Sequence, residues 1–103
     1  MDKISFGLRL AQLRIKKGVS AREMSQSLGQ NASYVNSIET GRIMPSLKTF
    51  LYICEYLEIA PAEFFDFENT DPVRLRSIIA DMKSLNDEQL AVIAKLVKDL
   101  AKR

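Results

Sequence analysis

The sequence predicts an all-α protein of 103 residues. Apolar residues recur at helical spacing along nearly the whole chain, and no stretch alternates apolar and polar residues as a half-buried strand does. Capping residues precede several of the apolar stretches, and glycines follow them. Hydrophobic residues make up 47% of the chain, which is enough for a packed core and argues against disorder.

The first expected helix ends at Gly18, because glycine tolerates the left-handed backbone found just after many helices. Phe6, Leu10 and Leu13 lie at positions i, i+4 and i+7 and form the apolar stripe of this helix. We therefore expect the polar residues between them to lie on the opposite side. These polar residues are Arg9, Gln12 and Lys16.

A second helix is expected to begin at Ser20 and to end at Gly29. The sequence Ser-Ala-Arg-Glu at its start has the form of a capping box, in which Ser20 and Glu23 accept each other's free backbone N–H groups. Met24 and Leu28 are the side chains that this helix is expected to bury.

A third helix is expected between an N-cap at Asn31 and a stop at Gly41, with Val35 and Ile38 facing inward. Two short helices joined by a three-residue turn that contains a glycine match the helix-turn-helix pattern. Ser25 must be small, because the two helix axes approach closely there. The outer face of the third helix is then free to enter a major groove.

A fourth helix is expected to open at Pro45-Ser46, and a short helical turn follows it with Pro61 near its start. Phe64 and Phe65 of that turn are expected to close the core. The expected apolar positions of the fourth helix are Leu47, Phe50, Leu51, Cys54 and Leu57.

The composition changes after the aromatic residues that close the core, and we place a domain boundary there. Residues 1–68 form the first expected domain, and residues 69–103 form a C-terminal extension of about two helices. Asp71 and the proline after it start the first of these helices, and a second capping box at Asn86 starts the other. The apolar stripe of the first is Leu75, Ile78, Ile79 and Met82.

The last expected helix carries an apolar seam whose members step by 3, 4 and 3 residues, which is heptad spacing. Two such heptads are too few for an independent coiled coil, so the seam should pack either on the N-terminal domain or on another copy of the chain. We expect a homodimer formed through residues 71–103. The seam residues are Leu90, Ile93, Val97 and Leu100.

The sequence offers no catalytic or metal-binding constellation. It has no histidine, and its one cysteine, Cys54, has no second thiol with which to share a metal. We interpret Cys54 as a small buried hydrophobe. We expect no enzymatic activity, no catalytic residue, no metal, no cofactor and no small-molecule ligand.

Charge is distributed unevenly along the chain. Residues 1–48 carry eight basic and three acidic side chains, whereas residues 49–70 carry five acidic side chains and no basic ones. One end of the domain is therefore suited to face phosphate, and the other end would be repelled by it. No apolar run is long enough for a signal peptide or a membrane span, so we expect a cytoplasmic protein without a membrane partner.

From about Leu10 to Phe65 the sequence resembles the Cro/C1-type helix-turn-helix repressors, the phage repressor and Xre family. The stretches that carry the resemblance are LAQLRIKKGVSAREMSQSLG and SYVNSIETGRIMPSLKTFLYICEYLEIAPAEFF. They include an Ile-Glu-x-Gly signature that starts at Ile38 and a Pro-Ser-Leu that starts at Pro45. The resemblance implies a five-helix, lambda-repressor-like domain that binds double-stranded operator DNA as a dimer. The expected function is that of a sequence-specific transcriptional repressor.

The resemblance also implies roles for individual residues. Arg14 corresponds to a first-helix arginine that pairs with the glutamate at Glu39, which is a structural role. Ser20 to Arg22 correspond to residues that bind phosphate at the start of the second helix. The expected base-reading positions are Ala32, Ser33 and Ser37, and contacts to the flanks of bases or to the DNA backbone are expected from Asn36 and Arg42.

Several positions depart from the family pattern or keep two interpretations. Gln30 replaces a buried aliphatic residue, and it either reaches toward DNA or stays solvated. Arg22 either contacts phosphate or pairs with Glu23. Tyr34 either contacts the DNA backbone or packs across the helix-turn-helix. Ser25 replaces the commoner alanine, and we expect this replacement to be nearly neutral.

The third helix carries no lysine, arginine or histidine, so positive charge must come from its flanks, from Arg22, Arg42 and Lys48. Ala21 stands where the family often has a glutamine that braces a base-reading neighbour, and that contact is therefore not expected. Hydroxyl and amide groups contact adenine edges, thymine methyls or bridging water, so we expect A·T-leaning readout helped by DNA shape. These groups belong to Asn31, Ser33, Asn36 and Ser37.

A second hypothesis is a protein-interaction module, such as an antitoxin or an adaptor. Tyr52, Tyr56 and Phe67 lie beyond the strictest apolar stripe and in the acidic region of the chain. Either they receive the C-terminal helices or they form the surface for a protein partner. Binding to random duplex DNA that falls steeply with salt would favour the DNA-binding hypothesis over this one.

Overall fold

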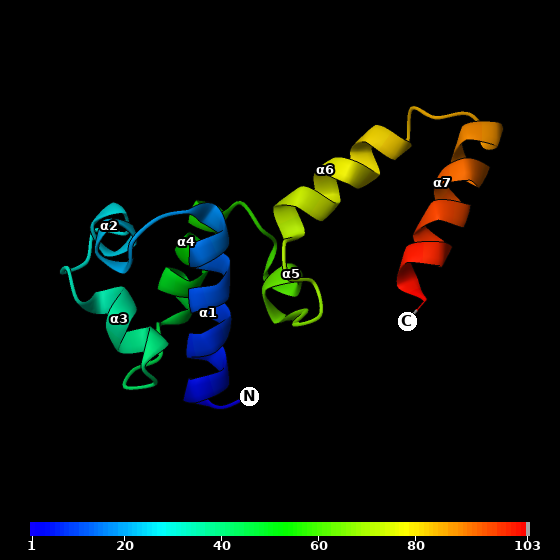
Figure 1. Ribbon diagram of the computed structural model, residues 1–103. Helices are drawn as coiled ribbons and strands as arrows, with labels where there is room; N and C mark the ends of the chain where they lie inside the picture. Colours follow the sequence, from blue (N-terminus) through cyan, green and yellow to red (C-terminus); the bar gives the residue numbers. More distant parts are fainter. Residues whose placement is uncertain (103) are drawn as a thin grey trace. The chain divides into compact units, whose positions relative to one another are not determined.

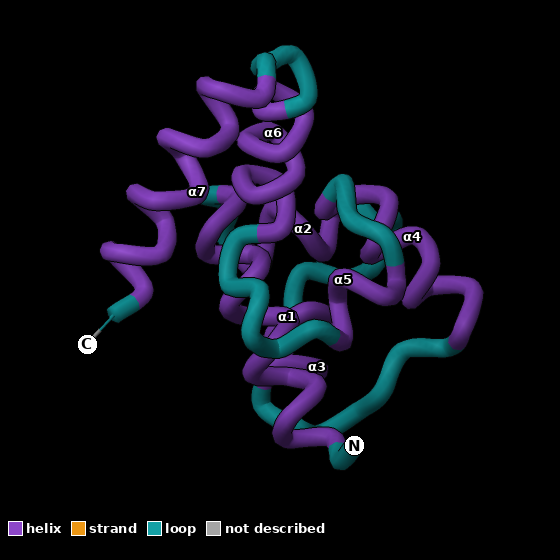
Figure 2. Tube along the Cα trace, turned by 90° about the vertical axis from the view of Figure 1, so that its right-hand side faces the viewer, coloured by secondary structure: helices purple, strands orange, loops and turns teal. Residues whose placement is uncertain are grey.

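The computed structural model describes residues 1–102, and Arg103, the last residue of the predicted extension, lies outside this range. The described chain is all-helical, as the sequence predicts (Figure 1). No residue in the described range is assigned to a strand (Figure 2). The helices are α1 (Lys3–Lys17), α2 (Ala21–Ser27), α3 (Tyr34–Glu39), α4 (Leu47–Leu57), α5 (Pro61–Phe65), α6 (Pro72–Met82) and α7 (Asp87–Ala101).

The chain divides into two compact units. Unit 1 comprises residues 1–73 and contains α1 to α5, and unit 2 begins at residue 74 and contains most of α6 and all of α7. No helix within residues 1–102 is long and apolar enough to cross a membrane. Over the same range, no group of three or more potential metal ligands comes together.

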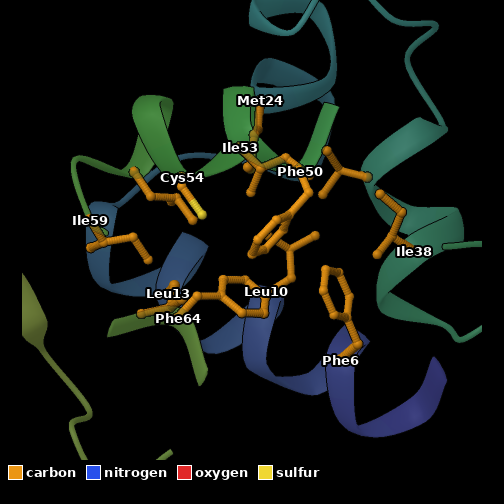
Figure 3. Packing of buried hydrophobic residues seen from close by; sticks show 12 residues of the cluster. Phe6, Leu10, Leu13, Met24, Ile38, Phe50, Ile53, Cys54, Ile59 and Phe64 are labelled. Carbon is orange, nitrogen blue, oxygen red and sulfur yellow. The ribbon is translucent and has the colours of Figure 1, made fainter. Parts of the chain in front are cut away.

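One apolar core holds the five helices of unit 1 together (Figure 3). The Phe64 side chain is fully buried in this core. Its ring centroid lies 4.8 Å from that of Phe6 and 5.1 Å from that of Phe50, the second pair in an edge-on arrangement. Each such aromatic pair adds about 0.5–1.5 kcal/mol beyond the area it buries. The other core side chains are Leu10, Leu13, Met24, Val35, Ile38, Ile53, Cys54, Leu57 and Ile59.

The core face of α4 differs from the predicted one. Leu47 and Leu51, both expected in the core, are 73% and 49% exposed, whereas Ile53 is fully buried. The inward stripe therefore follows positions 50, 53, 54 and 57, which repeat as i, i+3, i+4 and i+7.

Cys54 is buried as predicted, and its burial raises the pKa of the thiol to about 11, so the group stays protonated and unreactive at neutral pH.

Arg9 is buried, although the sequence pattern places it on the polar side of the first helix. Its guanidinium donates to the carbonyl oxygens of Phe64 at 2.6 Å, Glu63 at 2.7 Å and Asp66 at 2.9 Å. The last carbonyls of a helix lack intrahelical partners, and the planar fork of an arginine can satisfy several of them together. Arg9 thus fixes the end of α5 to α1.

The end of α1 and the start of α7 match the sequence analysis. Gly18 adopts a left-handed backbone with φ 82° after α1. Asn86 and Gln89 form the predicted capping box at the start of α7, with each side chain accepting the backbone N–H of the other at 2.9 and 3.0 Å. These local signals depend on neighbours a few residues away, which the sequence displays directly.

Within unit 2, α7 contains no buried residue. The seam residue Leu90 is 38% exposed and Val97 is 55% exposed, whereas Ile93 is half-buried. On α6, Ile78 and Ile79 are also exposed. Within unit 2, therefore, neither helix covers the apolar face of the other.

Candidate nucleic-acid interface

The helices α2 and α3 share one buried contact surface. Met24 of α2 and Val35 and Ile38 of α3 are fully buried, and Leu28 packs against the same core. Gly29, which follows α2, has φ 73°, a backbone conformation that side chains rarely adopt. The chain reverses at this glycine, and the buried side chains on either side of it fix the two helices against each other.

The third helix begins later than predicted, at Tyr34. Asn31 does not cap it but closes a turn before it, where its side-chain oxygen accepts the backbone N–H of Ser33 at 3.1 Å and the Ser33 hydroxyl at 2.8 Å. Its backbone carbonyl accepts the N–H of Tyr34 at 3.1 Å. Asparagine side chains often stabilise a turn in this way, in competition with helix formation.

Ser25 connects α2 to the first turn of α3. Its hydroxyl accepts the backbone N–H of Val35 at 2.9 Å and donates to the carbonyl of Ala21 at 2.7 Å. The Ser25 side chain is fully buried, so water does not replace these bonds. A buried N–H left without an acceptor costs about 1–3 kcal/mol. The sequence-based expectation that serine and alanine are nearly equivalent here did not take these bonds into account, and we now expect Ser25→Ala to be destabilising.

The ion pair expected between Arg14 and Glu39 is present and joins α1 to the end of α3. Two guanidinium nitrogens of Arg14 donate to the two carboxylate oxygens of Glu39, at 2.6 and 3.0 Å. A third donates to the carbonyl of Val19 at 2.8 Å. The hydrogen bond to Glu39 raises the pKa of Arg14, which therefore stays charged.

The backbones of α1 and α3 touch at Gly7, and this contact was not foreseen from the sequence. An alanine Cβ at this position would lie 2.7 Å from the carbonyl oxygen of Glu39 and still nearer to that of Ile38. Only a residue without a side chain fits such an approach. The position of α3 is thus fixed from two sides, by Gly7 and Arg14 on α1 and by Ser25 on α2.

The side chains proposed to meet DNA differ in exposure. In α3 and the turn before it, four of these residues are exposed, namely Gln30, Asn31, Ser33 and Asn36. The half-buried ones are Ala32, Tyr34 and Ser37.

Four of these residues can be assigned more closely. Tyr34 packs against the apolar core, which agrees with the second of its two interpretations. Ser33, Asn36 and Ser37 lie at i, i+3 and i+4, and they share the face of α3 that is turned away from Val35 and Ile38.

Polar groups also flank α3 on both sides. Ser20 is exposed and caps α2, where its hydroxyl oxygen accepts the N–H of Glu23 at 3.0 Å, which leaves its own proton free to donate. This bond is the Ser20 half of the predicted capping box. Arg22 and Arg42 are exposed, and no ion pair to either occurs in the described part of the chain. An exposed arginine without an acidic partner is available to a phosphate.

Comparisons with known proteins agree with this geometry. Residues 5–64 match the family described as helix-turn-helix domain. The chain is 38% identical to the restriction-modification controller protein C.AhdI from Aeromonas hydrophila, known from a high-resolution crystal structure. The match covers 62% of this chain and 93% of C.AhdI, with a TM-score of 0.58. No curated protein matches the sequence significantly. The chain belongs to the helix-turn-helix family of DNA-binding regulators, and specifically to the Cro/C1 type.

Proposed function

We propose that the protein is a transcriptional repressor that binds operator DNA by placing the outer face of α3 in the major groove. The observation that supports this most is the polar face formed by α3 and its N-cap on a buried helix-turn-helix core, where Ser33 and Asn36 are exposed and Ser37 is half-buried. A helix of this kind presents hydrogen-bonding groups to base edges. The likeness to a controller protein supports a regulatory role.

The side chains around this face contact different parts of the DNA. Arg22, Arg42 and Ser20 contact phosphates and set the position of the domain on the duplex. Gln30 and Asn31 precede α3 and contact the DNA beside the bases that α3 meets. Direct contacts to bases come from Ala32, Ser33 and Ser37, and Asn36 contacts the flanks of the bases or the DNA backbone. Tyr34 supports the interface by packing its ring on the core.

Replacing Arg42 by alanine is expected to weaken binding to all DNA sequences by a similar factor. A lost phosphate contact releases about one counterion fewer, so the slope of log affinity against log salt should fall by about one unit. Fluorescence anisotropy with specific and random duplexes over a range of salt concentrations measures this slope. Lys95→Ala, which removes an exposed positive charge from α7, is the matched control. An unchanged slope in Arg42→Ala would remove Arg42 from the interface.

We further propose that the repressor is a homodimer held together by the apolar seam of α7. A single domain of this size makes few base contacts, and a second copy doubles them. The accessible seam, with Leu90 38% exposed and Leu100 73% exposed, supports a partner helix of the same kind. The two half-sites then lie on one face of the duplex, about 34 Å or a multiple of that apart.

Deleting residues 86–103 is expected to convert the dimer into a monomer, which multi-angle light scattering measures as the mass of one truncated chain instead of two. In the full chain, Val97→Glu places a charge on the seam and should act in the same direction. Ala91→Glu adds the same charge on the opposite side of α7 and should leave the dimer intact. A truncated protein that stays dimeric would show that the contact lies elsewhere.

A second candidate function is protein binding through the aromatic residues of the acidic region, which are Tyr52, Tyr56 and Phe67. A groove with a volume of about 530 Å³ is lined in part by Tyr52, Glu55 and Tyr56, and the Lys17 ammonium lies 5.0 Å from the Tyr56 ring centroid. The Glu55 carboxylate and the Tyr52 ring favour a basic partner segment, whereas the Lys17 ammonium already lies over the Tyr56 ring. The salt titration described for Arg42 separates the two functions, because a pure adaptor would show no salt-dependent binding to duplex DNA.

A further inference from the structure

The start of α3 has an unusual source of hydrogen-bond acceptors. The first N–H groups of a helix have no intrahelical partner, and most helices satisfy one of them with the side chain of their own N-cap residue. The N-cap of α3 is Ser33, whose side chain makes no such bond. Tyr34 donates instead to the carbonyl of Asn31, and the next N–H, that of Val35, donates to Ser25 on α2.

We propose that Ser25 is the N-terminal cap of the recognition helix, supplied by the preceding helix, and that it acts as a positioning residue for base recognition. This inference rests on the proposed function, because it assumes that α3 meets the bases. It adds a residue that touches no DNA and yet determines how well α3 discriminates between sequences.

The geometry holds the Ser25 hydroxyl in one orientation. Its proton is given to the carbonyl of Ala21 at 2.7 Å, so a lone pair of its oxygen is directed to the N–H of Val35 at 2.9 Å. Both Ser25 and Val35 are fully buried, and no buried side-chain polar atom of the described residues lacks a partner. The contact is therefore a satisfied, water-free link between the two helices.

The short length of α3 makes this link important. Tyr34–Glu39 spans only six residues, and isolated helices of that length are unstable in water. Its first turn is therefore held by contacts from outside the helix. Asn36 follows Val35 directly, and Ser33 precedes it by two residues, so a shift of the Val35 backbone moves both of these side chains.

An alanine at position 25 fills nearly the same space but offers no acceptor. The first turn of α3 must then either move until water reaches the Val35 N–H or keep that group unpaired. In the first case α3 is displaced before it binds, and in the second its first turn is less stable and opens more often, so specific binding has to restore the native arrangement. Non-specific binding depends on phosphate contacts and does not need that order.

The test compares Ser25→Ala with Ile53→Val, which removes a methyl group from the buried core on α4 and leaves every hydrogen bond of α3 in place. Both variants are assayed well below their melting temperatures, so that the folded fraction stays near one. We expect the ratio of specific to random-duplex affinity to fall about tenfold in Ser25→Ala. The slope of log affinity against log salt should be the same in Ser25→Ala as in the unaltered protein. In Ile53→Val, the ratio of specific to random-duplex affinity should also be unchanged.

The outcomes separate the two proposals. An unaltered protein that prefers no sequence overturns the proposed function. If that protein discriminates and Ser25→Ala discriminates equally well, the proposed role of Ser25 is wrong while the function stands. An equal loss of discrimination in Ile53→Val also overturns the proposed role of Ser25, because the loss would then follow from lower stability alone.

Amide hydrogen exchange in the unaltered protein gives a second test that does not require the variant to fold. The Val35 amide is expected to be protected at least a hundredfold more than an exposed amide of a loop, despite its place at the start of a helix. Exchange at the rate of an unprotected amide would overturn the capping contact. Where Ser25→Ala folds, its Val35 amide should lose more protection than the amides of α4.

Discussion

Replacing Gly7 by alanine is expected to lower the free energy of unfolding of unit 1 by more than about 3 kcal/mol, which is among the largest effects of any single substitution. In an exposed helix the same change adds up to about 1 kcal/mol of stability, because alanine is the better helix former. Here the new Cβ would meet the carbonyl oxygens of Ile38 and Glu39, the latter at 2.7 Å. Backbone atoms cannot rotate away from such a contact, so α1 and α3 would have to separate.

Urea denaturation followed by circular dichroism measures this effect, and Lys16→Ala is its control. Lys16 is exposed on the same helix, so its replacement should change stability by no more than about 0.5 kcal/mol. A Gly7→Ala protein as stable as the unaltered one would mean that the two backbones are not in contact. The close approach of α1 to α3 would then have to be abandoned.

Replacing Arg14 by alanine is expected to cost about 3 kcal/mol, at the lower end of the range for breaking a buried ion pair. The side chains of Arg14 and Glu39 are 17% and 11% exposed, so water hydrates the unpaired Glu39 carboxylate in part and reduces the free-energy cost. The change leaves the Glu39 carboxylate without its two hydrogen bonds and the Val19 carbonyl without its donor.

A double-mutant cycle with Glu39→Gln separates the pair from the rest of the Arg14 contacts. The two substitutions should be less than additive, with a coupling free energy of about 1–3 kcal/mol, because each of them removes the same interaction. Strict additivity in urea denaturation would contradict the pair as a link between α1 and α3. The part of the Arg14 effect that remains in the Glu39→Gln background reports on the bond to Val19.

Much of the fold follows from local signals that the sequence contains. Caps and glycine stops locate the end of α1 and the start of α7, and apolar periodicity identifies Met24, Val35 and Ile38 as the shared surface of α2 and α3. These signals depend on residues within one or two helical turns. For the same reason, the all-α class and the place of the helix-turn-helix were predictable.

The residues that were misjudged depend on contacts across the fold. Arg9 looks like a polar surface residue until α5 brings three carbonyls to it from more than fifty positions away. Gly7 looks like an ordinary helix residue until α3 is placed against α1. Ser25 needs the position of the Val35 N–H before its hydroxyl has a role. Spacing in the sequence does not encode these distances.

The start of α3 and the core face of α4 were misjudged for a different reason, because two local solutions compete at each. Asn31 can cap a helix or close a turn, and the turn is the one formed. The fourth helix has apolar residues on more than one side, so periodicity alone does not choose between Leu51 and Ile53. Packing against α1 and α5 makes that choice.

The central claim is that α3 recognises DNA in a dimer, and selection of bound sequences from random duplex DNA at two salt concentrations tests it most directly. We predict a motif with two-fold symmetry, with half-sites about 34 Å or a multiple of that apart and with A·T pairs at most of its invariant positions. The motif should persist at the higher salt concentration, where non-specific binding is weakened. Failure to enrich any motif, or a motif without symmetry and dominated by G·C pairs, would contradict the account.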